Sequence, residues 1–396
     1  MNAENLMKDT LAAEINHLEP SLVEWRRDFH RNPELGFQEH RTSRVVREFL
    51  ESCGIEVRAC GRTGLVGVVR GGRPGLTVAL RADMDALPVA EIADHDYQSQ
   101  NPGVMHACGH DGHMAILMGA AKVLAARRES LRGSFVFLFQ PSEERFPGGA
   151  PLMVAEGALD GVDAIFGLHL WQPLPSGIVG LRAGAFMAQA DEFEVVVRGR
   201  GGHAAQPHLT IDPVVAASHL VVAAQSIVSR STDPLEAAVV SFTTMHGGRI
   251  HNIIADSVTL TGTVRTLDPG TARAVRARFV EVCESACRVF GATADVTYTE
   301  GYPPLVNDAA SVERVTRVAA RELGADRVRT IAPSMGGEDF AYYLQRVPGA
   351  FAFLGIGDGR PHPHHSPHFD IDESVLPVGA RLMAAVALDM LGRSAS

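Results

Sequence analysis

The chain has 396 residues, of which 46% are hydrophobic and 21% are charged, so two globular domains are expected rather than one core. Its 36 basic and 46 acidic residues give a formal net charge of −10, and neither sign gathers in a block, which argues against nucleic-acid binding and for small-molecule partners. Residues 1–20 lack the apolar centre of a signal peptide, and no uninterrupted run of 18 apolar residues occurs, so we expect a cytoplasmic protein that does not contact a membrane.

The first part of the chain predicts helices followed by strands. Residues 14–50 carry a two-helix pattern, and short apolar runs at 65–70 and 76–81 predict strands. The second of these runs is followed by Asp83 and Asp85. Two aspartates spaced by two residues after a strand are suited to directing carboxylates into a cleft.

The stretch from Met105 to His113 carries a pattern typical of a metal site. Cys108 and His110 are two residues apart, so in an extended segment both side chains would leave the same side of the backbone. The apolar stripe that follows, over residues 114–124, predicts a helix that begins at this stretch. We interpret the neighbouring His106 and His113 as residues that support the ligands or pack beside them.

Three later strands also precede side chains that bind metals. The strands are predicted at 134–139, 164–168 and 350–356. The side chains that follow are Glu143 and Glu144, then His169, then a loop with His362, His364, His365 and His368. Strands separated by helices predict a mostly parallel, helix-covered α/β sheet, in which ligands bind at the carboxyl ends of the strands.

Residues 188–300 predict a different domain. The pattern there reads strand 191–198, helix 212–230, strand 237–245, strand 257–265, helix 271–290 and strand 294–299. This βαββαβ order is the ferredoxin-like arrangement, an α+β fold. We therefore predict that 188–300 is an inserted domain within a catalytic domain formed by 1–187 and 301–396.

The collected side chains favour hydrolysis assisted by two metal ions. Cys108, His110, Glu144, His169 and a histidine of the 362–368 loop exceed the four ligands of one zinc ion. Zinc, manganese, cobalt and nickel all fit these ligand types. Two metals can activate one water molecule, and Glu143 is then the natural general base. The histidine loop could instead be a flexible metal-binding tract, and His203 and His208 could be ordinary loop residues.

Several ordered motifs resemble the dinuclear metallohydrolases related to aminoacylase and carboxypeptidase G, in the branch that contains hippurate hydrolases and indole-acetyl-amino-acid hydrolases. The resemblance extends from about Arg26 to Ala385. The motifs are Arg27-Asp28-Phe29-His30 with Pro33-Glu34-Leu35-Gly36, residues 80–88, Met105 to His113, Gln140 to Glu144, Gly201 to His208, and residues 334–340.

The resemblance implies a ligand set and a base. The ligands are Cys108, His110, Glu144, His169 and His365, and Glu143 is the catalytic base. It thus selects His365 among the loop histidines. The wider family has a ligand histidine near Asp83 and an aspartate at the position of Cys108, so Asp83 and Asp85 become expected supports of the ligands.

The resemblance also implies a homodimer formed through the inserted domain, with His203 reaching the partner's active site to stabilise an oxyanion. Asn252 and Arg265 match residues that hold the substrate carboxylate. The expected activity is cleavage of N-acyl amino acids, of the hippurate or N-acetyl type, by an enzyme with two divalent metal ions. The alternatives are a dipeptidase or carboxypeptidase on the same fold, or a relative that binds metal or ligand without turnover.

Overall fold

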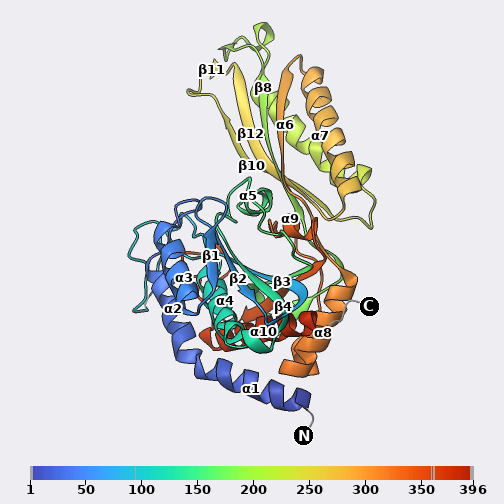
Figure 1. The fold of residues 1–396 in the computed structure, drawn as a ribbon. Coiled ribbons are helices and arrows are strands. Elements are labelled where there is room, and N and C mark those ends of the chain that lie inside the picture. The colour runs from blue at the N-terminus through green and yellow to red at the C-terminus, as the bar shows by residue number, and fades with distance from the viewer. Residues whose placement is uncertain (1–2, 94, 358, 360–361, 393–396) are drawn as a thin grey trace. The chain divides into compact units, whose positions relative to one another are not determined.

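The computed structural model describes residues 3–93, 95–357, 359 and 362–392, which Figure 1 shows as a ribbon. The chain divides into two compact units. The first comprises Met1–Gly184, Val306–Ala332 and Asp339–Ser396, and the second comprises Ala185–Leu305 and Pro333–Glu338. The second unit is an insertion that extends a few residues beyond 188–300 at both ends. It also includes Pro333–Glu338, a segment that the sequence pattern had placed in the catalytic domain.

The first unit is built on an eight-stranded sheet with the order β1-β2-β4-β3-β5-β16-β6-β15. The strands are β1 (Glu56–Ala59), β2 (Leu65–Arg70), β3 (Arg73–Asp83), β4 (Arg132–Gln140), β5 (Ala164–Pro175), β6 (Val179–Leu181), β15 (Val328–Thr330) and β16 (Gly349–Gly357). β3 is parallel to β4 and to β5, and β5 is parallel to β16, so the carboxyl ends of four central strands meet at one edge. The prediction of a mostly parallel sheet is confirmed.

Helices cover this sheet. They are α1 (Ala3–His17), α2 (Glu19–Arg31), α3 (His40–Ser52), α4 (His110–Ala125), α5 (Ala150–Ala155), α8 (Ala309–Leu323), α9 (Ala341–Leu344) and α10 (Leu376–Leu391). The α4 and α10 helices pack side by side and both contact β3, β4 and β5 (Figure 1). Since α4 also contacts α2 on its other side, almost every residue of α4 is buried, which explains its largely apolar sequence.

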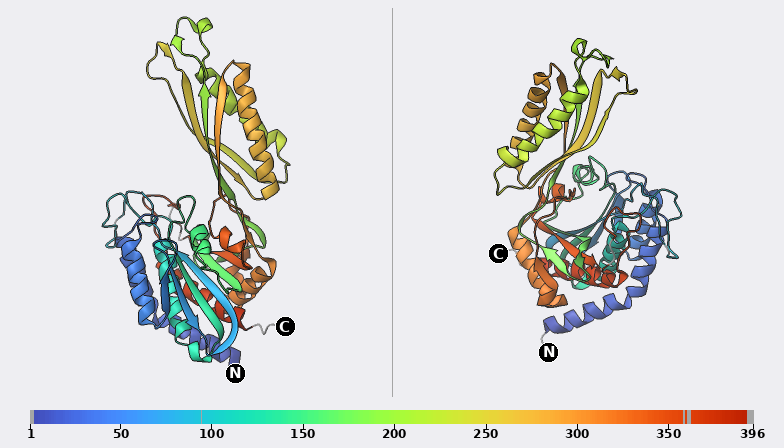
Figure 2. Two further views of the ribbon diagram at one scale, coloured as in Figure 1. Left: turned by 45° about the horizontal axis from the view of Figure 1, so that its top comes forward. Right: turned by 180° about the vertical axis from the view of Figure 1, so that it is seen from behind.

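The second unit has the predicted βαββαβ order. Its elements are β8 (Gln189–Arg198), α6 (Pro213–Ser226), β10 (Ala238–Gly247), β12 (Ser257–Thr266), α7 (Pro269–Val289) and β13 (Thr293–Tyr302), with short strands β9 (Gly202–His203) and β11 (Ile253–Ile254). The β7 (Gly184–Met187) and β14 (Leu305–Asn307) strands lie where the chain passes between the units. The antiparallel order β10-β12-β8-β13, with α6 and α7 against one face, is ferredoxin-like (Figure 2).

Two helical segments are long and apolar enough to cross a membrane by length and composition alone. The segment Glu373–Leu391 is mostly buried in the core of the first unit, so its apolar sequence is explained by packing. The segment Pro213–Ser231 buries one side, including Ala216 and Leu220, and exposes several valines on the other.

Candidate metal centre and hydrolytic site

Asp83, the last residue of β3, is buried with both carboxylate oxygens engaged. One oxygen lies 2.6 Å from Nδ1 of His113, and the other accepts a 2.7 Å hydrogen bond from Arg81. Arg81 is itself buried and also pairs with Asp339 at 3.0 Å. His113 uses its remaining nitrogen to accept the backbone N–H of Leu170 at 2.9 Å. Asp83 and His113 therefore form a fixed support below the site.

Asp85 connects two of the strand ends. Its two carboxylate oxygens accept the backbone N–H groups of Glu143 and Glu144, at 2.9 and 3.0 Å. Its backbone carbonyl lies 2.8 Å from Nδ1 of His110. Asp85 therefore holds the backbone of both glutamates that follow β4 and orients the first histidine of α4.

Cys108 and His110 converge by a different backbone path from the one predicted. The sequence analysis assumed an extended segment, but Cys108 and Gly109 form a bend and α4 begins at His110. Gly109 has φ +84°, a left-handed conformation that favours glycine. The bend places Cys108 Sγ 3.4 Å from His169 Nε2, and the ligand atoms of Cys108, His110 and His169 all lie within 4.8 Å of one another. His169 lies within β5, which continues to Pro175, rather than after a strand that ends at residue 168.

Glu144 and His365 complete the cluster. Glu144 Oε1 lies 3.1 Å from His365 Nε2 and 3.9 Å from His110 Nε2. Two other histidines of the same loop are engaged elsewhere: His364 Nε2 lies 2.9 Å from the Leu170 carbonyl oxygen, and His368 is bonded to the Ile92 carbonyl. The structure thus brings His365, among the loop histidines, to Glu144.

The donor set fits divalent cations. In His110 and His169 the Nδ1–H groups donate to backbone carbonyls, those of Asp85 and Leu170, which leaves each Nε2 with its lone pair available. His110 Nε2 and Glu144 Oε1 are buried, and neither has an aligned hydrogen-bond partner among the described residues, although His365 Nε2 lies 3.1 Å from Glu144 Oε1. Buried polar atoms without partners are costly, and a cation between them would satisfy both.

The charges around the cluster favour a cation as well. Burial opposes a charge on His110, but Asp83, with Asp85 and Glu144, outweighs it and raises the pKa of His110 to about 10. Burial, reinforced by the carboxylates Glu144 and Glu143, raises the pKa of the Cys108 thiol well above its usual range. The site therefore attracts positive charge, and a bound cation would convert Cys108 to the thiolate.

Glu143 lies beside this cluster and is mostly buried. Its carboxylate is within 4.8 Å of the ligand atoms of His110 and Glu144. The preceding residue, Ser142, has φ +49°, an uncommon conformation for a serine that turns the chain immediately before the two glutamates.

Glu39 was not singled out from the sequence, yet it holds this turn. One of its carboxylate oxygens accepts the Ser142 N–H at 2.9 Å and the other accepts the Thr63 hydroxyl at 2.5 Å. Burial raises the pKa of Glu39 to about 7. Local sequence does not distinguish Glu39 from surface glutamates, because its partners are 24 and 103 residues away.

The second unit carries the other three predicted residues, and they do not form one group. His203 on β9 pairs with Ile253, next to Asn252 and close to the start of β12 at Ser257. Arg265 lies near the other end of β12, eight residues from Ser257, which corresponds to about 27 Å along a strand. Within one chain, Asn252 and Arg265 therefore lie too far apart to hold one carboxylate together.

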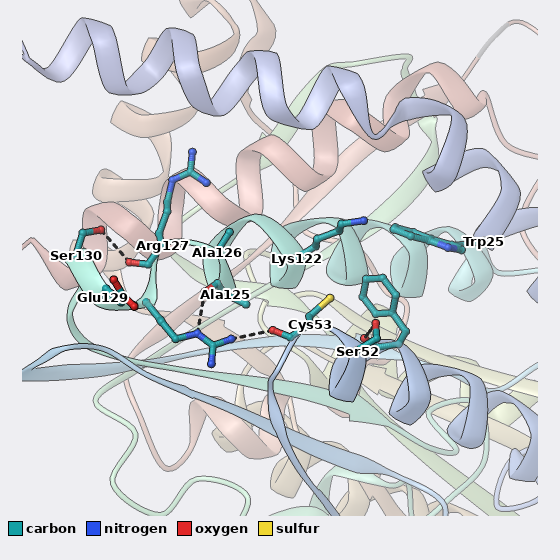
Figure 3. Close-up of a pocket in the computed structure, with 11 residues that line it drawn as sticks. Trp25, Ser52, Cys53, Lys122, Ala125, Ala126, Arg127, Glu129 and Ser130 are labelled. Atoms are coloured by element: carbon teal, nitrogen blue, oxygen red, sulfur yellow. Dashed lines mark hydrogen bonds between the residues drawn. The ribbon is translucent and has the colours of Figure 1, made fainter.

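A pocket of about 820 Å³ lies elsewhere in the first unit and contains none of the predicted site residues (Figure 3). Trp25, Lys122 and Arg127 line it, and Arg128 is bonded to the backbone carbonyl of Cys53 at 2.8 Å. Burial raises the pKa of the Cys53 thiol, so this cysteine is not activated. The pocket offers no catalytic group comparable with the cluster.

Comparison with known proteins identifies the family. The sequence model of peptidase family M20/M25/M40 matches residues 79–389. IAA-amino acid hydrolase ILR1-like 2 of Arabidopsis thaliana is 43% identical over 386 residues, 95% of this chain and 88% of that protein. Thermostable carboxypeptidase 2 of Saccharolobus solfataricus is 40% identical over 387 residues, 96% of this chain and 98% of that protein.

A solved structure agrees with this assignment. The crystal structure of Bacillus subtilis YXEP, described as a dinuclear metal binding peptidase from the M20 family, superposes with a TM-score of 0.83 and 35% identity, covering 95% of this chain and 99% of that one. The resemblance seen in the motifs is thus confirmed. The chain belongs to peptidase family M20/M25/M40 and is a hydrolytic enzyme of its amidohydrolase branch.

Proposed function

We propose that this enzyme cleaves the amide bond of N-acyl amino acids, of the hippurate or N-acetyl amino acid type, giving a carboxylic acid and an amino acid. One observation carries the chemistry: separate strand ends and the start of α4 bring a metal-ligand set together beside a buried glutamate. The set is Cys108, His110, Glu144, His169 and His365, beside Glu143. The similarity to an IAA-amino acid hydrolase supports the substrate class.

These five side chains would hold two divalent cations. Bound there, the cations would lower the pKa of a water molecule and polarise the substrate carbonyl. Thiolate and imidazole ligands favour zinc, and the carboxylate leaves manganese, cobalt and nickel as further choices. Asp83 and Asp85 would serve as supports. Asp83 holds His113 and lies 3.7 Å from His110 Nε2, and Asp85 holds the backbone N–H groups of Glu143 and Glu144.

Glu143 would move the proton. As general base it takes a proton from the attacking water, and as general acid it returns that proton to the leaving nitrogen. The hydrogen bond that the Glu143 backbone N–H donates to Asp85 fixes the backbone position from which the Glu143 side chain extends. Because Glu143 is mostly buried, little bulk water reaches its carboxylate.

We also propose that the enzyme acts as a homodimer in which His203 of the partner subunit stabilises the oxyanion. Two features of the second unit support this. β10 is an edge strand of its sheet, with backbone groups available for pairing. On α6, Val214 and Val215 are both 42% exposed and Val222 is 70% exposed. A second subunit covering this surface would bury the valines.

A dimer also accounts for the distance between Asn252 and Arg265 within one chain. Asn252 lies beside His203, so a partner that supplies His203 supplies Asn252 as well, while Arg265 of the first chain can hold the same substrate carboxylate. The α10 helix is buried in the core and the valines of α6 suit a protein interface, so packing accounts for both apolar helices. A cytoplasmic location remains part of our proposal.

The assembly is tested by sedimentation of Val222→Glu beside the control Val289→Glu, a change on α7 at a residue that is 78% exposed. We expect monomers for Val222→Glu and dimers for the control. Mixed Glu143→Gln and His203→Ala subunits should regain activity. Failure to regain it after confirmed subunit exchange would contradict the role of His203.

The substrate class is tested with metal-stripped enzyme reloaded separately with zinc, manganese, cobalt or nickel. Rates are compared on hippurate, N-acetyl amino acids, unblocked dipeptides and peptides with a free carboxyl terminus. We expect the N-acyl amino acids to be cleaved fastest. The similarity to a carboxypeptidase makes peptide cleavage the second candidate, and exclusive cleavage of peptides would overturn our substrate assignment.

The base is tested with Glu143→Gln and a matched surface control, Glu48→Gln, whose side chain is 68% exposed. We expect Glu143→Gln to bind metal as the parent does but to lose about 10²–10⁴-fold in rate. A metal-loaded Glu143→Gln enzyme with the parent rate would refute the mechanism. Absence of turnover by the parent with every metal and substrate would favour a binding protein.

A further inference from the structure

A second group of metal-ligand side chains lies in the first unit, outside the proposed dinuclear centre. His30 comes from α2, while Glu91 and His95 come from the segment between β3 and α4. Glu91 Oε1 lies 3.1 Å from His30 Nε2 and 3.1 Å from His95 Nε2. All three ligand atoms lie within 4.8 Å of one another. We propose that these residues form a third divalent-cation site, of the His₂Glu type, that serves a structural role.

The spacing suits one ion. Ligands about 2.0–2.2 Å from a tetrahedral zinc ion lie roughly 3.3–3.6 Å from each other, so the two 3.1 Å separations need only a small expansion. The group offers three protein ligands, and His95 is partly exposed, which leaves a path for the ion and a position for water.

In His30 and in Glu91, one polar atom of the side chain is held by a residue outside the group, which orients the other atom toward the group. His30 Nδ1 lies 2.7 Å from the Asp111 carboxylate and carries a proton there, while Nε2 is hydrogen-bonded to Glu91 Oε1 at 3.1 Å. A cation between Nε2 and Oε1 would take the place of the proton in this second bond. Glu91 uses its other oxygen to accept the Ser99 N–H at 2.6 Å. His95 lies stacked on Tyr97, with ring centroids 3.8 Å apart.

The ring nitrogens of His95 are the strongest indication. Both are buried and neither has a hydrogen-bond partner among the described residues, although Nε2 is 3.1 Å from Glu91. The two groups are therefore close but are not aligned as donor and acceptor. This is the arrangement expected of two ligands that point to a common ion rather than to each other.

The local charge also favours a cation. The carboxylates of Glu91, Asp111, Asp370 and Glu373 outnumber the guanidinium groups of Arg26 and Arg27. Burial and Arg26 oppose a charge on His30, yet the bonds to Asp111 and Glu91 outweigh them and raise its pKa. The cluster thus holds positive charge, either as a proton on His30 or as a metal ion that displaces it.

An ion here would fasten the segment that carries Glu91 to α2. The same segment supports the loop of His365: Ile92 N donates to the Pro367 carbonyl at 2.7 Å, and His368 Nδ1 donates to the Ile92 carbonyl at 2.6 Å. The site would therefore stabilise the neighbourhood of the proposed dinuclear centre without contributing a ligand to it.

The experiment measures zinc per subunit by native mass spectrometry of the full-length protein after stripping and titration with zinc. The parent and the control His17→Ala, an exposed histidine at the end of α1, should each bind three ions. His95→Ala and Glu91→Gln should each bind one fewer. Equal zinc content in His95→Ala and His17→Ala would overturn the proposal.

The same comparison in a Cys108→Ala/His110→Ala background separates this site from the dinuclear centre. There, adding His95→Ala should remove one further ion, whether or not the enzyme hydrolyses any substrate. As an independent readout, zinc should slow hydrogen exchange of residues 91–99 in that background and should not do so after His95→Gln, a change that keeps a polar side chain. Unchanged exchange on adding zinc would also refute the proposal.

Discussion

Arg26 provides a severe test of how buried charge stabilises the first unit. Its guanidinium is fully buried and contacts Asp111 at 2.8 Å, Asp370 at 2.8 Å and Glu373 at 3.1 Å. Methionine has a similar length but no charge, so Arg26→Met leaves the fully buried Asp111 without its guanidinium partner. Removing one member of a buried ion pair costs about 3–5 kcal/mol, and we expect a loss of that size in the free energy of unfolding.

The assay is urea unfolding followed by tryptophan fluorescence. The chain has two tryptophans, Trp25 and Trp171, and both lie in the first unit, so the signal reports on the unit that contains Arg26. Arg44→Met is the matched control, because Arg44 is 63% exposed and its pair with Glu48 spans 4.0 Å. Such a surface pair contributes about 0.3–0.5 kcal/mol.

A double variant isolates the charge effect from lost packing. In Arg26→Met/Asp111→Asn no unpaired charge remains between the two positions, so the double variant should be more stable than the sum of the single losses indicates. Strictly additive losses, or an Arg26→Met loss no larger than that of Arg44→Met, would refute the reasoning.

The ion pair between Arg26 and Asp111 also predicts that the free energy of unfolding depends on pH. Burial alone would raise the pKa of Asp111, but Arg26, with His30, holds it well below the usual range. The stabilisation is therefore complete above the unfolded-state pKa of about 4 and is lost as pH falls toward the lower folded-state value. Asp111→Asn should show a weaker loss of stability between about pH 4 and pH 2 than the parent, as measured by the same urea titrations.

Two further predictions concern the turn that carries Glu143 and Glu144. Glu39→Ala leaves the buried Ser142 N–H without its acceptor, so it should lower the free energy of unfolding by about 1–3 kcal/mol and should lower kcat. Glu39→Gln keeps an acceptor oxygen and should retain most activity, and equal kcat for the two variants would contradict the positioning role of Glu39. A Cβ at Gly149 would lie 1.8 Å from the Pro141 carbonyl oxygen, so Gly149→Ala should lower the free energy of unfolding in urea by at least about 1–3 kcal/mol. In the control Gly392→Ala the new Cβ would lie 3.4 Å from its nearest neighbouring atom, so this change should be nearly neutral. Equal losses for the two variants would show that the turn can relax.

The sequence determined the elements and much of the chemistry, because both depend on local patterns. Apolar runs followed by Asp83 and by Glu143 and Glu144 identified two strands, and the carboxyl ends of neighbouring parallel strands meet at one edge of a sheet. The alternation of strands and helices between 188 and 300 gave the ferredoxin-like order, and the spacing of Cys108 and His110 indicated a metal site at the start of a helix.

Tertiary structure decided what depends on contacts between distant segments and on backbone conformation. It replaced the extended path at Cys108 with a bend at Gly109, and it placed Asn252 next to the β9–β11 pair, far from Arg265 near the end of β12. It also revealed Glu39 below the catalytic turn and the convergence of His30, Glu91 and His95. No local pattern encodes these features, since a lone glutamate or histidine acquires its role only from the residues that folding brings within about 3 Å of it.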